Sequence, residues 1–230
     1  MIEVKHVTKT YGKKHNRFRA LDDVNFVIPD GASVAILGKS GSGKSTLMHA
    51  MSGLDRPEVG EVIVDGVDIL QLKKKAVDTF RSEQIGFIFQ AFFVQANESV
   101  FHNVSLPLEI AGVPKRSRKR RVETALKIVD LGDKIKQKAG NLSGGQKQRL
   151  AIARAIVNKP RIVFADEPTG NLDSATGELV ENMLFKLNKV GGSTLVVVTH
   201  DEELAQKCDM LIRIKDGKIE KIVDQKGVLS

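Results

Sequence analysis

The sequence predicts an α/β fold, with a parallel sheet, an antiparallel β subdomain and an inserted helical subdomain. Three observations predict it. A glycine-rich loop at residues 38–46 joins a short apolar run to a helix-like stretch. After residue 158, short apolar runs alternate with helix-like segments, as in parallel sheets covered by helices. Between residues 90 and 158, strand signals fade and apolar residues recur with helical spacing instead.

The amino-terminal part predicts the antiparallel sheet. Residues 2–7 alternate between apolar and polar side chains, which is typical of a half-exposed strand. Residues 24–28 form a second candidate strand that ends at the turn 29–31. Residues 61–64 form a third, followed by the turn signal Asp65-Gly66. We expect these strands to lie beside the glycine-rich loop.

The carboxyl-terminal part predicts the parallel sheet. Its apolar runs lie at 161–165, 194–198 and 210–214, and helix-like segments at 175–189 and 202–207 alternate with them. This alternation favours a parallel sheet with helices on both faces.

The middle of the chain predicts helices. Residues 118–129 and 146–157 both have apolar residues at helical spacing. We therefore interpret 90–158 as a helical subdomain, inserted into an α/β core that comprises 1–89 and 159–230. The whole chain is then a single domain.

Composition limits the class of protein. The 230 residues suffice for a buried core, and 41% hydrophobic with 28% charged residues is ordinary for a soluble globular protein. No apolar stretch reaches the length of a transmembrane helix, and the N-terminus lacks the apolar core of a signal peptide. Cys208 is the only cysteine, which excludes an intrachain disulfide and favours a reducing, cytosolic location.

Residues 38–46 match the G-x-x-x-x-G-K-[ST] pattern of a phosphate-binding loop. Glycines let backbone N–H groups close around phosphate oxygens, and the following helix directs its positive end at the same anion. Lys44 would reach the β- and γ-phosphates, and the Ser45 hydroxyl would bind Mg²⁺. A glycine-rich linker is the alternative, which the flanking strand and helix signals disfavour. The predicted nucleotide-binding residues are Gly38, Lys39, Ser40, Gly41, Ser42, Gly43, Lys44, Ser45 and Thr46.

Two adjacent carboxylates, Asp166 and Glu167, end the apolar run 162–165. In open α/β sheets, ligands bind outside the carboxyl ends of the strands. We therefore expect Asp166 to hold Mg²⁺ and Glu167 to orient or deprotonate an attacking water. His200 follows another apolar run and could lie at the same edge, although a lone histidine there is more often structural.

A third motif, L-S-G-G-Q at residues 142–146, precedes a predicted helix. Ser143 and Gln146 have the spacing of a capping box, so an ordinary helix start is one interpretation. Gly144 and Gly145 fit it poorly, since glycine costs about 1 kcal/mol relative to alanine inside a helix. Glycines at a helix N-terminus do let an anion approach closely. Two anion sites beside a single phosphate loop suggest one nucleotide shared between two copies of the chain.

The order of these motifs resembles that of the ATP-binding cassette (ABC) ATPases, over nearly the whole chain. The resemblance implies a RecA-like core of the P-loop NTPase type. The stretch D-E-P-T-G-N-L-D at 166–173 is most similar to one branch of the family. That branch includes lipoprotein-releasing, macrolide-exporting and bacitracin-type peptide-resistance ATPases, and a cell-division ATPase that partners an extracytoplasmic-loop membrane protein.

The resemblance also implies roles for individual residues. Tyr11 would stack on adenine, Gln90 would contact Mg²⁺ and respond to a membrane partner, and His200 would lie near the γ-phosphate. The implied catalytic residues are Glu167 and His200, and the implied metal ligands are Ser45, Gln90 and Asp166. The residues implied to act on the opposite subunit are Ser143, Gly144, Gly145, Gln146 and Asp173.

The function implied is that of the ATP-binding subunit of an ABC transporter-type complex. An ATP-dependent homodimer would hydrolyse ATP with Mg²⁺ and drive a separate membrane permease or extracytoplasmic-loop membrane protein. It would lie at the cytoplasmic face of the membrane, held there by that partner. A non-transporting regulator of the cell-division type stays an alternative. A soluble ABC ATPase of DNA repair or translation is disfavoured, because the chain has one cassette and no sustained heptads between its motifs.

Two segments have competing interpretations. Residues 115–121 carry six positive charges and no negative one, within a chain of net charge +8. They could be a solvated helix start, a contact with an anionic membrane leaflet or a nucleic-acid contact. No aromatic residues interleave with them, so we expect no nucleic-acid partner. Five of the ten phenylalanines fall within 87–101, where they could fill the helical subdomain or form a groove for a permease helix.

Overall fold

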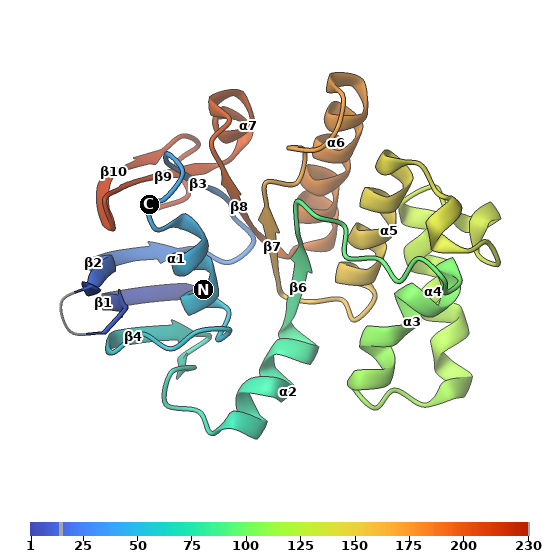
Figure 1. Ribbon diagram of the computed structural model, residues 1–230, viewed down its shortest axis with the longest axis horizontal. Helices are drawn as coiled ribbons and strands as arrows, with labels where there is room; N and C mark the ends of the chain where they lie inside the picture. The colour runs from blue at the N-terminus through green and yellow to red at the C-terminus, as the bar shows by residue number, and fades with distance from the viewer. Residues whose placement is uncertain (14–15, 230) are drawn as a thin grey trace. The chain divides into compact units, whose positions relative to one another are not determined.

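The computed structural model describes residues 1–13 and 16–229, which form two compact units (Figure 1). Unit 1 comprises Met1–Asp78 and Thr194–Ser230, and unit 2 comprises Thr79–Ser193. The segment 90–158, predicted to be a helical subdomain, lies wholly within unit 2. The division of the chain at residues 89 and 158 stays a prediction.

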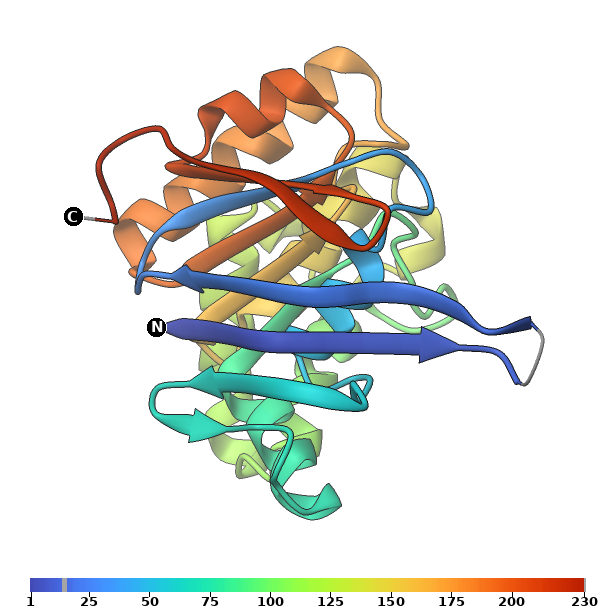
Figure 2. The same ribbon diagram turned by 90° about the vertical axis from the view of Figure 1, so that its left-hand side faces the viewer.

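Unit 1 contains the predicted antiparallel sheet, which Figure 2 shows facing the viewer. Its strands are β1 (Ile2–Tyr11), β2 (Phe18–Ile28), β4 (Val59–Val64) and β5 (Val67–Asp68), in the order β2-β1-β4-β5. Ile2, Val4 and Val7 of β1 are buried while Lys5 and His6 are exposed, so one face of the strand packs on the core. The sheet reaches further than predicted, because β2 begins at Phe18 and not near Val24.

Unit 1 also contains parallel strands. β3 (Ser33–Leu37) pairs in parallel with β8 (Thr194–Thr199) and with β9 (Met210–Lys215). All residues of β3 and β8 are buried, which explains their continuous apolar runs. α1 (Lys44–Met51) contacts β8 as well as β1 and β2, and α7 (Glu202–Lys207) packs on β3 and β8. Because β3 and α1 both contact β8, the loop that joins β3 to α1 is held at both of its ends.

Two strands of unit 1 were not predicted, the two-residue β5 and β10. β10 (Lys218–Asp224) pairs antiparallel with β9 after the turn at Asp216-Gly217. Most of its side chains are exposed or half-buried, as is common for a strand at the edge of a sheet. Its sequence therefore lacks the apolar run that identified the predicted strands.

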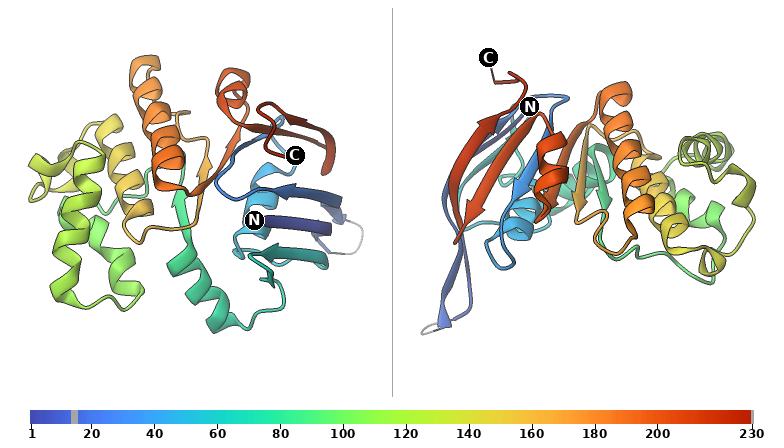
Figure 3. Two further views of the ribbon diagram at one scale, coloured as in Figure 1. Left: turned by 180° about the vertical axis from the view of Figure 1, so that it is seen from behind. Right: turned by 90° about the horizontal axis from the view of Figure 1, so that it is seen from above.

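Unit 2 combines two parallel strands with a group of helices. β6 (Ile85–Ile88) pairs with β7 (Ile162–Asp166), and β6 is preceded by α2 (Lys74–Gln84), whose residues 74–78 belong to unit 1. α3 (Val100–Ile110), α4 (Lys115–Ile128) and α5 (Gly144–Ile156) pack against one another, as Figure 3 shows from two directions. α6 (Ser174–Gly191) contacts α5, and 3₁₀ turns cover Gly132–Lys134 and Ala139–Asn141.

Helices predominate in the segment 90–158, as predicted. α3 was missed because Pro107 lies inside it and because the polar residues Asn103 and Ser105 lie among its buried residues, which breaks the helical spacing of apolar ones. Within the described residues, no helix is long and apolar enough to cross a bilayer.

Candidate nucleotide-binding and catalytic residues

The phosphate loop of unit 1 joins β3 directly to α1. Gly43 is the N-cap of α1 with φ 105°, and no side chain caps this helix start. Lys44 is nearly buried, and its Nζ donates to the carbonyl oxygens of Gly38 at 2.7 Å and Lys39 at 2.9 Å. The ammonium group is thus folded back over the loop. The bare N–H groups at the start of α1 and this ammonium together make a site for an anion.

The glycines of the loop are needed for different reasons. A Cβ at Gly43 would lie 2.5 Å from the Ala20 oxygen, and one at Gly38 would lie 2.4 Å from the Ile214 oxygen. At Gly41 (φ 77°), a Cβ would meet no heavy atom of the described residues within 4 Å. Gly38 and Gly43 are therefore required by close packing. Gly41 instead leaves open space at the loop surface, where a phosphate can approach the backbone.

Two further observations define the loop. The Ser42 Oγ is buried and has no hydrogen-bond partner among the described residues. An unpartnered buried hydroxyl is costly and is expected where a ligand supplies the missing partner. The Gly217 N–H, in the turn between β9 and β10, donates to the Ser42 oxygen at 3.0 Å. This turn therefore supports the loop, a role that no sequence pattern indicated.

Tyr11 lies at the end of β1, close to the phosphate loop. Its hydroxyl donates to the Asp55 carboxylate at 2.5 Å and is hydrogen-bonded to the side chain of Thr46 in α1. Burial and the neighbouring Asp55 carboxylate raise the pKa of the Tyr11 hydroxyl. The Lys9 Nζ lies 5.2 Å from the ring centroid, and Tyr11 is 38% exposed. Both predicted nucleotide contacts, Tyr11 and Thr46, thus lie side by side.

His200 follows the last residue of β8 and is exposed. Thr199 of β8 pairs with Leu37 of β3, the residue immediately before Gly38. Because the two strands are parallel, their carboxyl ends meet at one edge of the sheet. The register therefore brings His200 to the same edge as the start of the phosphate loop, while its predicted place beside Asp166 and Glu167 stays a prediction.

Gln90 and the two carboxylates meet at one edge of the strand pair in unit 2. Ile88 of β6 pairs with Ala165 of β7, so Gln90 and Asp166 both follow the paired ends. The Gln90 Nε2 donates to the Asn171 Oδ1 at 3.4 Å, and the Asn171 Nδ2 donates to the Gln90 oxygen at 3.0 Å. Asn171 thus ties the segment after β6 to the loop after β7.

Glu167 has an unusual backbone. Its φ is 44°, a left-handed conformation that a side chain with a Cβ rarely adopts, at a cost of roughly 1–2 kcal/mol. The loop that follows is held by Gln148 of α5, whose Nε2 donates to the Pro168 oxygen at 2.5 Å. Such backbone strain is concentrated at functional sites, where the surrounding structure holds it in place. The direction of the Glu167 side chain is therefore set by its neighbours.

The motif at 142–146 forms the start of α5. Ser143 and Gln146 make the complete capping box, with the Ser143 Oγ accepting from the Gln146 N–H at 3.3 Å and the Gln146 Oε1 accepting from the Ser143 N–H at 3.0 Å. The structural interpretation of this pair is thus correct. Asp173 is likewise the N-cap of α6: it accepts from the N–H and the hydroxyl of Thr176, which lowers the pKa of its carboxyl.

The two glycines of the motif differ from each other. A Cβ at Gly145 would lie 2.4 Å from the Cγ2 of Thr176, so packing of α5 on α6 requires this glycine. A Cβ at Gly144 would meet only the Phe92 Cζ, at 4.0 Å, among the described residues. Packing within unit 2 therefore leaves Gly144 unexplained, as expected for a glycine that admits an anion.

Gly145→Ala should lower the free energy of unfolding by about 1–3 kcal/mol, because the new methyl group overlaps Thr176, whose hydroxyl is fixed by Asp173. Gly144→Ala is the matched control and should change stability by less than about 0.5 kcal/mol. Thermal denaturation measures both. Adding Thr176→Ser, which removes the methyl group and keeps the hydroxyl, should restore the stability of Gly145→Ala. Equal losses for both glycine variants would show that the close packing is not the cause.

Several supporting residues had no signal in the sequence. Arg154 donates to the backbone oxygens of Phe93 at 2.6 Å and Phe92 at 2.9 Å, and burial lowers the pKa of its guanidinium. The buried Asn103 side chain donates to the Gln95 oxygen at 3.1 Å and accepts from its N–H at 2.8 Å. These two side chains hold the segment after Gln90. Both helices carry other polar residues as well, so no sequence pattern distinguishes these two.

Comparison with known proteins identifies the family. A sequence profile described as ABC transporter matches residues 21–170. The chain belongs to the ABC transporter family. It is 44% identical over 219 residues to the lipoprotein-releasing system ATP-binding protein LolD of Syntrophus aciditrophicus, a match that covers 95% of this chain and 98% of that protein. It is 42% identical to the macrolide export ATP-binding/permease protein MacB of Hyphomonas neptunium, covering 95% of this chain and 34% of MacB.

Solved structures agree with this assignment. The dimeric bacterial ABC transporter cassette MJ0796 has a TM-score of 0.90 and 41% identity, covering 99% of this chain and all of that one. A second structure of that cassette, a dimer in a post-hydrolysis state bound to ADP and Pi, has a TM-score of 0.89 and 40% identity. The predicted fold, a P-loop NTPase core with β and helical additions, is confirmed. This ABC protein is an ATP-binding subunit of a transporter-type complex, an ATPase that uses ATP and Mg²⁺.

The residues present fit both groups. The bare start of α1, the open space at Gly41 and the unpartnered Ser42 hydroxyl fit a phosphate chain. Mg²⁺ prefers oxygen ligands, and each of its predicted ligands, Ser45, Gln90 and Asp166, carries a side-chain oxygen.

Proposed function

We propose that two copies of this ABC ATPase bind ATP head to tail. Each site combines the phosphate loop of one copy with the α5 N-terminus of the other. The observation that carries this proposal is Gly144, a glycine at a helix N-terminus that packing within unit 2 does not require. The dimeric structures of the cassette MJ0796, one of them with ADP and Pi, support it.

A charge at Gly144 tests the shared site. Gly144→Glu places a carboxylate in the first turn of α5, where it favours the helix dipole and should leave stability unchanged. The same carboxylate would repel a γ-phosphate held by the partner. In a Glu167→Gln background with Mg²⁺ and ATP, light scattering should show dimers for the parent and for Gly144→Ala, and monomers for Gly144→Glu. Dimers of Gly144→Glu at the parental ATP concentration would contradict the proposal.

In each site, different residues contact the phosphates, the adenine and Mg²⁺. Lys44 and the N–H groups of residues 39–46 bind the β- and γ-phosphates, while Tyr11 stacks on the adenine. Ser143, Gly144, Gly145 and Gln146 of the other copy contact the γ-phosphate, and Asp173 lies at the same interface. Ser45, Gln90 and Asp166 would hold Mg²⁺, which would neutralise charge on the phosphate oxygens.

Hydrolysis depends on two further residues. The Glu167 carboxylate accepts the proton of the attacking water, and the backbone strain at this residue directs its side chain. His200 donates a hydrogen bond to the γ-phosphate oxygens, where negative charge is concentrated. Closure of the dimer excludes bulk water, so these contacts act where electrostatic interactions are strong. Loss of the γ-phosphate removes what holds the two copies together, and the dimer reopens.

The work is delivered to a separate membrane permease, through the segment after Gln90. The ring of Phe87 stacks on those of Phe89 and Phe164. Phe93 then meets Phe89 edge-on, with 5.4 Å between the two ring centroids. Phe93 is 68% exposed and has φ 45°, so this ring is presented outward and does not fill the core. The Arg154 guanidinium fixes the backbone beneath it. A rigid exposed ring of this kind suits a groove for a permease helix.

Phe93→Ala should weaken binding of the permease at least about tenfold, because an exposed aromatic anchor is worth 2 kcal/mol or more. Stability should change by less than about 1 kcal/mol, since most of the ring is already in water. Val190→Ala, at an apolar side chain that is 81% exposed on α6, is the control. Recovery of the integral membrane partner from solubilised membranes, relative to the parent, gives the result. Unchanged recovery of the partner with Phe93→Ala would show that this surface is not part of the permease interface.

Such a subunit would lie at the cytoplasmic face of the membrane, held by its partner. The relatives that are named for lipoprotein release and for macrolide export favour transport over the cell-division type of regulator. The mechanism above applies to both, because either partner would receive the same closing motion.

A further inference from the structure

The basic run at 115–121 contributes to a cavity that the ATPase mechanism does not use. This cavity has a volume of about 870 Å³ and lies in unit 2 between one face of α4 and the end of α5. Its charged rim consists of Arg116, Arg120, Arg121 and Lys159, and no acidic residue lines it. The floor is apolar: Ala125, Ile128, Ile156 and Val157. We propose that it binds a small soluble organic phosphate, with the phosphate on the rim and an apolar ring or chain on the floor.

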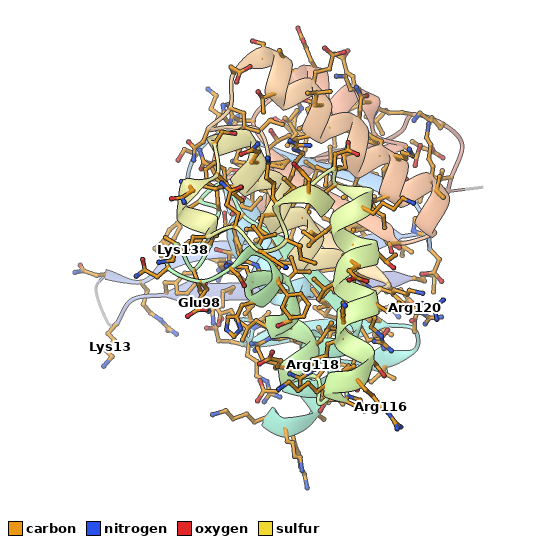
Figure 4. All side chains as sticks on the ribbon, turned by 90° about the vertical axis from the view of Figure 1, so that its right-hand side faces the viewer. Lys13, Glu98, Arg116, Arg118, Arg120 and Lys138 are labelled. Carbon is orange, nitrogen blue, oxygen red and sulfur yellow. The ribbon has the colours of Figure 1, made fainter. Side chains whose placement is uncertain are left out.

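The cations of the run differ in their partners. Arg118 pairs with Glu109 at 3.0 Å and donates to the Val113 oxygen at 2.8 Å, while Lys119 lies 3.9 Å from Glu123. Within residues 1–13 and 16–229, no carboxylate pairs with any of the four rim cations. Figure 4 shows Arg116 and Arg120 on one side of α4 and Arg118 on the other. The unpaired guanidinium groups are therefore those that face the cavity.

This arrangement costs stability when no anion is bound. Arg116 and Arg120 are four residues apart on one helix face, where like charges repel and destabilise the helix. Arg116 also lies in the first turn of α4, whose N-terminus has no side-chain cap and no acidic residue, and a cation there opposes the helix dipole. A bound anion removes both costs at once. Guanidinium groups suit phosphate in particular, since they donate two parallel hydrogen bonds to it.

The opposite wall of the cavity is rigid. The Asn158 Nδ2 donates to the Ser82 oxygen at 2.8 Å and the Pro107 oxygen at 3.2 Å, which fixes the turn after α5. Lys159 then adopts φ 56°, and its N–H closes the turn on the Ile156 oxygen at 2.8 Å. The floor residue Ile128 is 47% exposed, so apolar surface is available to a ligand. A cavity of this size, lined by four apolar residues and seven polar or charged ones, offers both kinds of contact to a small organic anion.

The position of the cavity disfavours a lipid head group as the source of the phosphate. Figure 4 shows Glu98 and Lys138 on one side of unit 2 and Arg120 on the other. Glu98 belongs to the segment after Gln90 that we assign to the permease. A membrane leaflet would lie on that side, away from the rim. Only this step rests on the proposed function, because the cavity and its charges do not depend on a permease.

The test uses phenyl phosphate as the probe and the full chain with saturating Mg²⁺ and ADP, so that the phosphate loop is occupied. Titration followed by saturation-transfer NMR on the phenyl protons should give saturable binding. The Kd for phenyl phosphate should rise at least about tenfold in the triple variant Arg116→Gln, Arg120→Gln and Arg121→Gln. The control variant carries Lys115→Gln, Lys119→Gln and Lys127→Gln, which remove three charges from the same helix outside the cavity. It should change the Kd less than about threefold. Ile128→Ser should weaken the binding of phenyl phosphate while leaving the binding of inorganic phosphate unchanged.

The other outcomes overturn the proposal. Equal effects of the two triple variants would show general attraction to a basic helix, and absence of saturable binding would show that the cavity is not a phosphate site. In a parallel arm, vesicles containing phosphatidylglycerol are floated with the parent and with both triple variants. Vesicle binding that is lost in the arginine variant, without saturable phenyl phosphate binding, would assign the rim to a membrane surface instead.

Discussion

Glu167→Gln is expected to abolish most ATP turnover while ATP binding is retained. The amide has the shape of the carboxylate but cannot accept the proton of the attacking water, and general bases contribute about 10²–10⁴-fold to rate. The rate of phosphate release should therefore fall at least about 100-fold. Because the ATP that joins the two copies is no longer consumed, a closed dimer should accumulate. Phosphate release and light scattering with Mg²⁺ and ATP measure the two effects.

A matched variant separates this effect from a general loss of charge. Glu178 is an exposed carboxylate on α6, in the same unit as Glu167, and has no assigned role. Glu178→Gln should hydrolyse ATP at the parental rate and show no persistent dimer. If Glu167→Gln also hydrolyses ATP at the parental rate, Glu167 is not the base.

Gly43→Ala should remove ATP binding and destabilise unit 1. Its φ of 105° is unfavourable for any residue with a Cβ, and the added methyl group would lie 2.5 Å from the Ala20 oxygen. The backbone penalty of about 1–2 kcal/mol and the steric overlap together should cost about 3 kcal/mol. For a chain of this length, that corresponds to a fall in melting temperature of roughly 6–12 °C.

Gly41→Ala is the control for this prediction. Its φ is also positive, at 77°, but a Cβ there would meet open space. It should cost only about 1–2 kcal/mol, for the backbone alone. Thermal denaturation without nucleotide isolates the effect on folding, since bound ATP would stabilise the parent through linkage. Equal losses for the two variants would mean that the contact with Ala20 does not constrain the loop.

The sequence predicted the elements whose function requires a distinctive pattern. The buried strands β3, β7 and β8 were found because both of their faces are covered, which leaves continuous apolar runs. The phosphate loop and the capping box at Ser143 were found because backbone geometry demands particular residues at fixed spacing. By contrast, the exposed edge strand β10 and the helix α3 with its internal Pro107 leave weaker patterns.

The supporting contacts could not be predicted, because they join residues far apart in the chain. Arg154 holds the backbone at Phe92, 62 positions away, and Gln148 holds the Pro168 oxygen. The need for glycine at 145 arises from Thr176 on another helix. The sequence gives no account of such pairs until the fold places them together. The same is true of the basic run, where only the structure separates the paired Arg118 from the arginines that line the cavity.

The shared nucleotide site is tested most directly by crosslinking two different variants. Ser40→Cys, in the exposed part of the phosphate loop, and Ser143→Cys, at the start of α5, are made in separate Glu167→Gln chains. The native Cys208 is buried, so it should not interfere with a thiol-specific reagent. With Mg²⁺ and ATP, a short bismaleimide should join the two variants into a covalent dimer when they are mixed. Little dimer should form from either variant alone, or from the mixture without ATP. Absence of the covalent dimer in the mixture with ATP, or equal yields without ATP, would contradict a site shared head to tail.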